Sequence, residues 1–180
     1  MPIITESDAI PGVLLVELRP FDDDRGRFTE TFRKEWFPQR TWHNVQSNRS
    51  DSRAGVLRGL HYQVKHAQGK LVRVIAGAVF DVAVDLRRSS PSFGRWVGVR
   101  LSAENRDMLW VPAGFAHGFY VLSEGAEFLY KTTDYWSPEH ERTLLWNDPA
   151  LGIAWPLSGE PILNAKDAAG RPLAHAEVYD

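Results

Sequence analysis

Short apolar runs separated by turn residues constrain the fold of this chain more than any other feature of its sequence. Runs rich in Val, Leu, Phe and Trp alternate with Gly, Pro, Asp and Ser along most of its 180 residues. This spacing is typical of many short β-strands joined by turns. Within residues 81–86, apolar side chains at 82, 84 and 86 alternate with Asp81, Ala83 and Asp85, which is the period of a half-buried strand.

The same pattern predicts where the elements lie. We expect strands at residues 13–18, 28–32, 96–101, 108–111, 118–122 and 126–132. Residues 71–86 indicate a hairpin that turns near Ala76 and Gly77. Single helical turns are expected at residues 34–37 and 103–106, and loops with short helix from residue 157 onward. The prediction is an all-β jelly roll or sandwich with few short helices, in which residues 1–180 form one domain with N-terminal strands and a C-terminal loop and helix extension.

Composition limits the classes of partner. The formal net charge is −2, so no general attraction to nucleic acid or to an acidic membrane is expected. No apolar run is long enough to cross a bilayer, and the first residues lack the pattern of a signal peptide. The chain has no cysteine, which excludes disulfides and thiolate metal ligands and is compatible with the cytoplasm.

Two glycine-rich stretches carry histidines that invite a metal-site interpretation. GVLRGLHYQ contains His61, and VPAGFAHGF contains His117. These stretches resemble the two ligand motifs of the cupins, G-x5-H-x-H and P-x-G-x2-H. The resemblance implies a double-stranded β-helix with both histidines pointing into its mouth.

The first cupin motif is incomplete in this sequence. Gln63 replaces the second histidine, and no carboxylate lies four residues further on. Two imidazoles and an amide make a poor site for zinc or non-haem iron. We therefore expect no metal, and we expect His61 and His117 to serve as acid–base or hydrogen-bonding groups rather than as ordinary core histidines.

A longer series of motifs resembles one enzyme family. In order, these are DDRGRFTETF, VQSNRS, GVLRGLHYQ, QGKLVRVIAGAVFDVAVDLRRSSPSFGRWVGVRLSAENR, LWVPAGFAHGF, EFLYKTTDYW, WNDPALGIAWP and NAKD. Together they closely resemble the dTDP-4-dehydrorhamnose 3,5-epimerase family, from about Pro11 to Asp167. The resemblance implies epimerisation of dTDP-4-dehydro-6-deoxy-D-glucose at C3 and C5, the two carbons beside the C4 ketone, with no metal and no cofactor.

The resemblance also implies catalytic residues. His61 takes the position of the base, and Asp167 in NAKD takes that of the carboxylate that holds it. Tyr130 in EFLYKTT matches the general acid. Lys70 and His117 are the candidates near the ketone oxygen, where positive charge would stabilise an enolate. Two further roles stay open for His117, a hydrogen bond to the sugar and support of His61. From the residues alone, Asp167 would be a loop aspartate. Alternation along residues 127–132 puts Phe128, Tyr130 and Thr132 on one strand face, where Tyr130 is as readily a barrel-core tyrosine as a functional acid.

Substrate contacts follow in the same way. Arg58 suits the diphosphate, since guanidinium pairs with phosphate oxygens in a bidentate fork. Arg58 and His61 would point to opposite faces of a regular strand, so we expect a bulge at Gly59. Trp136 stands where many members stack a tyrosine on thymine. The remaining nucleotide contacts implied by the resemblance are Arg25, Glu30, Gln46, Ser47, Asn48, Glu141 and Lys166.

Two of these contacts imply an assembly. In the family, Arg25 and Glu30 reach a neighbouring subunit's site, which implies a homodimer. Ser47 stands where relatives usually carry aspartate, so only its backbone contact is expected to be preserved.

Three alternatives remain open at this point. A relative that inverts only C3 or only C5 would share all these residues. A jelly-roll module that binds a nucleotide sugar without catalysis would not need a base, its carboxylate and an acid together. A metal-dependent cupin oxygenase is disfavoured by Gln63.

Overall fold

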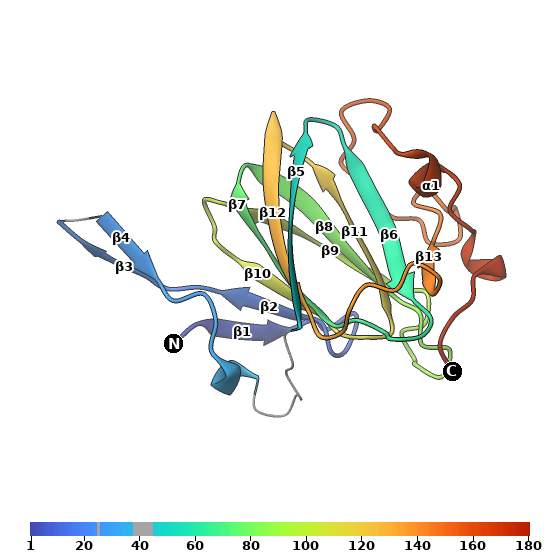
Figure 1. Cartoon of the computed structure of the whole chain (residues 1–180), viewed down its shortest axis with the longest axis horizontal. Helices are drawn as coiled ribbons and strands as arrows, with labels where there is room; N and C mark the ends of the chain where they lie inside the picture. The colour runs from blue at the N-terminus through green and yellow to red at the C-terminus, as the bar shows by residue number, and fades with distance from the viewer. Residues whose placement is uncertain (25, 38–44) are drawn as a thin grey trace.

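Two antiparallel β-sheets packed face to face form the body of the computed structural model, which describes residues 1–24, 26–37 and 45–180 (Figure 1). One sheet has the order β1-β2-β10-β7-β12-β5, with bounds Ile3–Glu6, Leu14–Glu17, Met108–Val111, Lys70–Ala76, Gly125–Thr132 and Gln46–Arg53. The other has the order β13-β6-β11-β8-β9, with bounds Glu141–Thr143, Leu57–Gln63, Phe115–Val121, Ala78–Asp85 and Trp96–Ser102. This is the predicted all-β jelly roll.

Three apolar clusters hold the layers together. One lies between the sheets and includes Val72, Phe119 and Phe128. A second covers the outer face of the six-stranded sheet with the segment around η1 (Lys34–Trp36). A third covers the outer face of the five-stranded sheet with the C-terminal segment, which contains α1 (Ala165–Ala168) and η2 (Leu173–His175). Both sheets are therefore buried on two faces over much of their area.

The expected hairpin at residues 71–86 is wrong in its pairing. The chain does turn at Gly77, but β7 and β8 belong to different sheets and do not pair. Gly77 has φ +75°, and a Cβ there would lie 2.0 Å from the carbonyl oxygen of Gly125. A residue without a side chain is needed for the chain to pass from one layer to the other at this crowded corner.

The expectation that β8 is half-buried is also wrong. Its even positions pack under the C-terminal segment, while Asp81, Ala83 and Asp85 face the interior between the sheets. Both aspartates are fully buried. Asp85 accepts hydrogen bonds from Arg87, Ser90 and Ser92; burial alone would raise its pKa, but these bonds hold the pKa at about 2. Polar residues in a period-2 pattern thus mark partnered burial here rather than exposure.

Most of the other predicted elements are present. Residues 108–111 form β10, and residues 13–18, 96–101, 118–122 and 126–132 overlap β2, β9, β11 and β12. Residues 28–32 overlap β4 at its end only. The single helical turn expected at residues 103–106 is present, because the N–H of Arg106 donates to the carbonyl of Ser102 at 3.0 Å. The polar strand β5 was not expected, because its apolar content is low. No helix among the described residues is long and apolar enough to cross a membrane.

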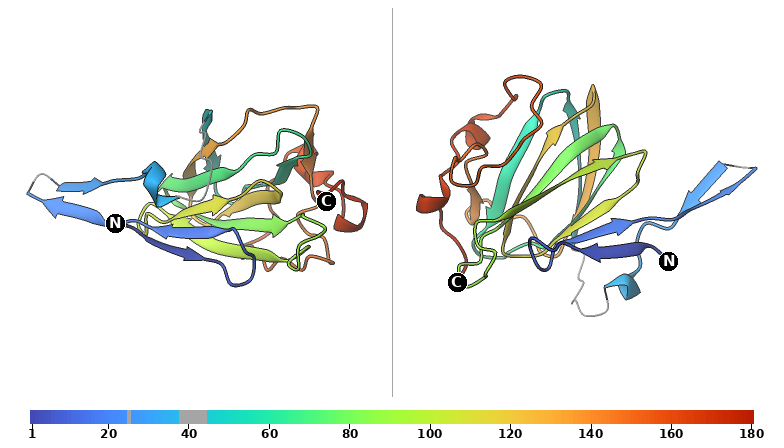
Figure 2. Two further views of the ribbon diagram at one scale, coloured as in Figure 1. Left: turned by 90° about the horizontal axis from the view of Figure 1, so that it is seen from below. Right: turned by 180° about the vertical axis from the view of Figure 1, so that it is seen from behind.

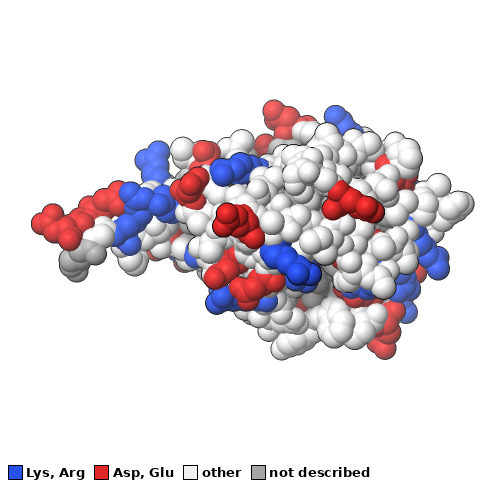
Figure 3. Space-filling model, turned by 90° about the horizontal axis from the view of Figure 1, so that it is seen from above, with Lys and Arg blue, Asp and Glu red and all other residues white. Residues whose placement is uncertain are grey.

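A two-stranded arm projects from the body (Figures 1 and 2). It consists of β3 (Pro20–Asp23) and β4 (Gly26–Thr29), which pair with each other and, among the described strands, with no other. Phe21 and Phe28 lie opposite each other on it and are 63% and 68% exposed. In Figure 3 acidic side chains gather at the far end of the arm and basic ones nearer the body, while charges of both signs are scattered over the visible face of the body. The arm therefore presents both charge and apolar surface to its surroundings.

Candidate active site

A cavity of about 380 Å³ opens between the two sheets and receives side chains from both. From the six-stranded sheet come residues of β5, β7 and β12, and from the five-stranded sheet residues of β6, β11 and β13. The lining residues are Gln46, Asn48, Ser50, Arg58, His61, Gln68, Lys70, His117, Gly118, Phe119, Phe128, Tyr130, Trp136, Glu141, Asn164 and Lys166. Most of the predicted site residues thus meet in one place.

His61 is held from behind by Asp167. The Nε2 atom of His61 lies 2.5 Å from Oδ1 of Asp167, which is 1% exposed. The side chain of Asn164 caps α1 by accepting from the Asp167 backbone N–H at 2.7 Å, and this fixes the carboxylate. The second carboxylate oxygen accepts from the backbone N–H of Gly59 at 3.3 Å. A carboxylate placed in this way selects the imidazole tautomer and stabilises its protonated form.

The expected bulge at Gly59 is present. His117 pairs with His61 and Phe119 with Arg58, so β6 has one more residue than β11 between these two pairs. Gly59 has φ +119°, and a Cβ there would lie 2.6 Å from Cα of Gly118. The bulge turns Arg58 and His61 toward the same cavity although they are three residues apart.

Tyr130 lies on the opposite wall, on β12. Burial raises the pKa of its phenol, nearby Glu141 raises it further, and Arg58 and a hydrogen bond with Asn48 partly oppose this. The phenol is therefore protonated at neutral pH and has a proton to give. Asn48 in turn accepts from the side chain of Gln46 at 2.9 Å.

Lys70 lies at the start of β7 and is 9% exposed. Burial lowers the pKa of its ammonium to about 8, although the carboxylates of Glu141 and Asp81 partly oppose the effect. Its Nζ donates to the backbone carbonyl of His61 at 3.3 Å, across the interior from one sheet to the other. A cation with so little water around it interacts strongly with charge that develops in the cavity.

His117 forms a second histidine–carboxylate pair. Its Nε2 lies 2.9 Å and 3.1 Å from the two carboxylate oxygens of the fully buried Asp81. His117 and His61 are directly opposite each other on adjacent strands. Asp81 was not predicted as a site residue, because the pattern of β8 suggested that it faces solvent.

Three of the predicted nucleotide contacts lie at the exposed mouth of the cavity. Trp136 is 56% exposed there. Glu141 on β13 and Lys166 in α1 form an ion pair at 2.8 Å. Aromatic surface next to paired charges suits a nucleobase with its polar edge.

Some predicted residues lie elsewhere. Alternation along β5 turns Gln46, Asn48 and Ser50 toward the cavity and Ser47 toward solvent, so the Ser47 side chain makes no contact there. Glu30 lies outside the cavity and pairs with Arg33. Arg25 lies outside the described residues.

Several lining residues were missed. Ser50 follows from the period of β5 once that strand is recognised, and Phe128 follows from the period of β12, where it shares a face with Tyr130. Gln68 and Asn164 reach the cavity through packing of distant segments. Their residue types gave no specific signal in the sequence.

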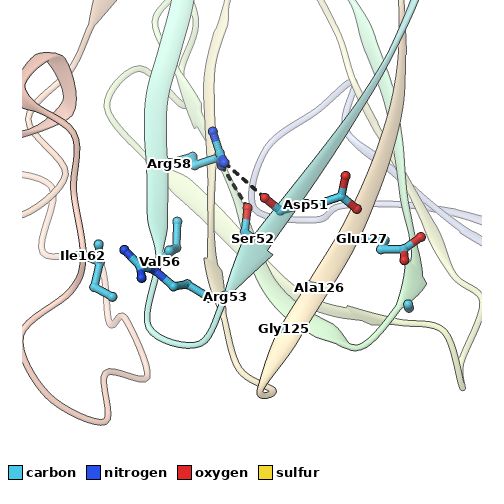
Figure 4. A pocket seen from close by; sticks show the side chains of 10 residues that line it. Asp51, Ser52, Arg53, Val56, Arg58, Gly125, Ala126, Glu127 and Ile162 are labelled. Atoms are coloured by element: carbon cyan, nitrogen blue, oxygen red, sulfur yellow. Dashed lines mark hydrogen bonds between the residues drawn. The ribbon is translucent and has the colours of Figure 1, made fainter.

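A larger and more open cavity of about 760 Å³ lies beyond Arg58 (Figure 4). Arg58 borders both cavities, and its Nε donates to Oγ of Ser52 at 2.9 Å. The side chains around it include Asp51 and Glu127, which both pair with Arg49. No histidine or tyrosine lines this second cavity among the residues that the structure describes, so the smaller cavity is the one equipped for proton transfer.

No group of three or more His, Asp or Glu side chains suited to hold a metal ion occurs in residues 1–24, 26–37 and 45–180.

Comparison with known proteins identifies close relatives of the chain. A family model described as dTDP-4-dehydrorhamnose 3,5-epimerase matches residues 7–175. A protein of that name from Pseudomonas aeruginosa is 60% identical over 174 residues, which cover 95% of this chain and 96% of the relative.

Solved structures agree with this similarity. A dTDP-6-deoxy-D-glucose-3,5-epimerase from Legionella pneumophila, in complex with dTDP-4-keto-L-rhamnose, superposes with a TM-score of 0.94 at 48% identity over 98% of this chain and 95% of the other. A 3′-monoepimerase from Streptomyces bikiniensis, in complex with dTDP-quinovose, gives a TM-score of 0.87 at 36% identity over 94% of this chain and 88% of the other.

Proposed function

The chain belongs to the dTDP-4-dehydrorhamnose 3,5-epimerase family and is an isomerase of nucleotide sugars, and we propose that His61 and Tyr130 are its proton-transfer groups. Its reaction is epimerisation of dTDP-4-dehydro-6-deoxy-D-glucose at C3 and C5 to dTDP-4-dehydro-β-L-rhamnose, as in relatives of the same name at up to 60% identity.

Each inversion is a pair of proton transfers. The His61 imidazole takes the proton from the carbon beside the C4 ketone, which leaves an enolate and a protonated ring stabilised by Asp167. The Lys70 ammonium lies near the enolate oxygen and stabilises its charge, a contribution of about 3 kcal/mol for one good donor. Tyr130 then gives its phenolic proton to the other face of the carbon. Both groups recover their starting states by exchange with solvent.

One observation supports this assignment above the others. His61 comes from the five-stranded sheet and Tyr130 from the six-stranded sheet, and both line the cavity between them. A sugar ring bound in that space would have a base on one side and an acid on the other, as inversion at a carbon requires. A module that only binds nucleotide sugars has no need of this arrangement.

The substrate's other parts are assigned to the remaining lining residues. We propose that Arg58 pairs with the diphosphate, that Trp136 stacks on thymine, and that His117, held by Asp81, hydrogen-bonds the sugar. Gln46, Asn48, Glu141 and Lys166 are proposed nucleotide contacts. Arg58, Trp136 and His117 line the cavity together with these four residues.

The chain is also similar to a 3′-monoepimerase, so the competing function is inversion at C3 alone. The two are separated by incubating the protein with dTDP-4-dehydro-6-deoxyglucose in D2O and locating deuterium in the product by NMR. Label at both C3 and C5 is expected. Label at C3 alone would assign the chain to the mono-epimerases, and no label would end the assignment as an enzyme.

We also propose a homodimer, with nucleotide contacts shared between subunits. The exposed Phe21 and Phe28 on the projecting arm, and Glu30 outside the cavity of its own chain, support this proposal. We propose that the enzyme works in the cytoplasm. A chain without cysteine needs no oxidising compartment for disulfide formation, and its substrate is a nucleotide sugar.

A further inference from the structure

Gln63 stands at the position where the cupin motif has its second histidine, yet it does not line the cavity among the residues described there. It is 3% exposed and lies at the end of β6, two residues after His61. A buried primary amide is costly unless its donors and acceptor are satisfied. Where its hydrogen bonds go therefore indicates what the residue does.

All three hydrogen bonds of this amide go to backbone groups. Nε2 donates to the carbonyl of His66 at 2.7 Å and to the carbonyl of Tyr135 at 3.2 Å, while Oε1 accepts from the N–H of Ser137 at 2.8 Å. The two carbonyls can only accept and the N–H can only donate, so the orientation of the amide is determined by its partners.

Two of these bonds flank Trp136 in the sequence. The amide takes the carbonyl that precedes Trp136 and the N–H that follows it, and so clamps the backbone on both sides of the exposed indole. The N–H of Trp136 itself donates to Oε1 of Gln46 at 3.0 Å. Tyr135 and Trp136 are exposed, so apolar packing does little to hold this loop. The side-chain amides of Gln63 and Gln46 hold its backbone instead.

The bond to His66 ties a second loop to the first. His66 adopts φ +54°, a left-handed conformation that is uncommon for a residue other than glycine. Its Nδ1 lies 3.5 Å from Oδ2 of Asp134, at the start of the loop that carries Trp136. Gln63 thus connects the end of β6 to both loops at the mouth of the cavity.

We propose that Gln63 is a positioning residue for nucleotide recognition, which holds the backbone at residues 135–137 so that Trp136 is presented to the base of the dTDP moiety. The inference rests on the proposed stacking of Trp136. It assigns to this position a role in binding the nucleotide and none in proton transfer. Gln63 is two residues from the base, His61, on the same strand. Its amide nevertheless makes its hydrogen bonds to the backbone of the two loops, which is why we assign it no part in proton transfer.

The test is the affinity for dTDP, measured by calorimetry on the full chain. Gln63→Glu places an anion against two carbonyls and should weaken binding about tenfold, as should Trp136→Ala, since base stacking contributes about 1–3 kcal/mol. The double variant should bind no more weakly than the weaker single variant. In turnover, Gln63→Glu should raise KM about tenfold with kcat within about twofold of wild type.

Asn105→Asp is the matched control. The amide of Asn105 also bonds to three backbone groups, the N–H of Ser102, the N–H of Asp107 and the carbonyl of Arg100, but it lies in a turn that does not line the cavity. It should lower thermal stability without changing the affinity for dTDP. If Gln63→Glu does not fold, Gln63→Met keeps the volume and removes the bonds, and the same weakening is expected.

The outcomes separate the two proposals. Unchanged affinity in Trp136→Ala would remove the stacking assignment on which the inference rests. Weakened affinity in Trp136→Ala with unchanged affinity in the Gln63 variants would overturn the role of Gln63 alone. Full additivity of the two changes would also overturn it, because it would mean that Gln63 acts through something other than Trp136.

Discussion

The imidazole of His61 and the carboxylate of Asp167 meet at 2.5 Å although they are separated by 106 residues in the chain. Asp167 is 1% exposed, so its carboxylate is almost completely shielded from bulk water, and its second oxygen accepts from the backbone N–H of Gly59. The histidine and aspartate of a hydrolase triad are arranged in the same way, and there the carboxylate fixes the tautomer and the orientation of the imidazole.

Replacing Asp167 by Asn should lower turnover far more than binding. The amide keeps the shape but loses the charge that stabilises protonated His61, so kcat should fall by about 10²–10⁴-fold with KM nearly unchanged. Steady-state kinetics with the natural substrate measure both. A variant that retains kcat within about tenfold of wild type would separate Asp167 from the base.

Replacing Tyr130 by Phe should uncouple proton removal from inversion. The ring still packs against Phe128, whose centroid lies 6.0 Å away, so the cavity keeps its shape. Exchange of the C3 proton with solvent should continue within about tenfold of wild type, whereas formation of the inverted product should fall about a hundredfold. Deuterium exchange and product formation are followed in the same NMR sample, and equal losses in both would refute the assignment as acid.

Loss of the Lys70 proton should make kcat/KM fall as the pH rises in alkaline solution. Burial lowers its pKa to about 8, so the ammonium is present below this value and is lost as the pH rises through it. Because kcat/KM reports on the free enzyme, it should decline above pH 8 in the wild type. Lys70→Arg, whose side chain stays charged, should move that decline to higher pH at a lower maximal rate; a decline that does not move would exclude Lys70 as its origin.

The bulge at Gly59 should be costly to alter. Gly59 has φ +119°, which is strained for any residue with a side chain, and a Cβ there would lie 2.8 Å from the carbonyl oxygen of His117. Gly59→Ala should lower the free energy of unfolding by about 2–4 kcal/mol, as seen from the urea midpoint. Gly159 has open space around it, so Gly159→Ala is the control and should change the free energy by less than about 0.5 kcal/mol. Similar values for the two would mean that the bulge tolerates a side chain.

The projecting arm should carry the dimer. Phe21→Ser combined with Phe28→Ser removes its exposed apolar pair, so the mass in sedimentation equilibrium should fall from that of two chains to that of one. Leu122→Ser, which alters an apolar residue on the body that is 38% exposed, should leave the mass unchanged. A dimer that persists in the arm variant would place the interface elsewhere.

Local pattern was sufficient to predict much of the framework. The apolar run at residues 108–111 forms β10, and alternation along β12 places Phe128 and Tyr130 on the same side, where both line the cavity. The bulge at Gly59 followed from the need for Arg58 and His61 to share a face, a need that rested on the roles implied by the family resemblance. The predictions for β10 and β12 depend only on neighbours in the chain.

What failed depends on layers and on distant contacts. The local sequence of residues 70–86 does not indicate that β7 and β8 belong to opposite sheets. The period of β8 likewise does not predict that Asp81 contacts His117. Asp167 would have been a loop aspartate without the resemblance to a family. Gln63 was recognised as a missing ligand, but its hydrogen bonds to two loops required coordinates.

The most direct test of the account compares wild-type protein with His61→Ala in D2O, with dTDP-4-dehydro-6-deoxyglucose as substrate and NMR as the readout. Deuterium should enter C3 and C5 with the wild type and neither carbon with the variant, while both proteins still bind dTDP. Incorporation by His61→Ala at the wild-type rate would contradict the claim that this imidazole removes the proton.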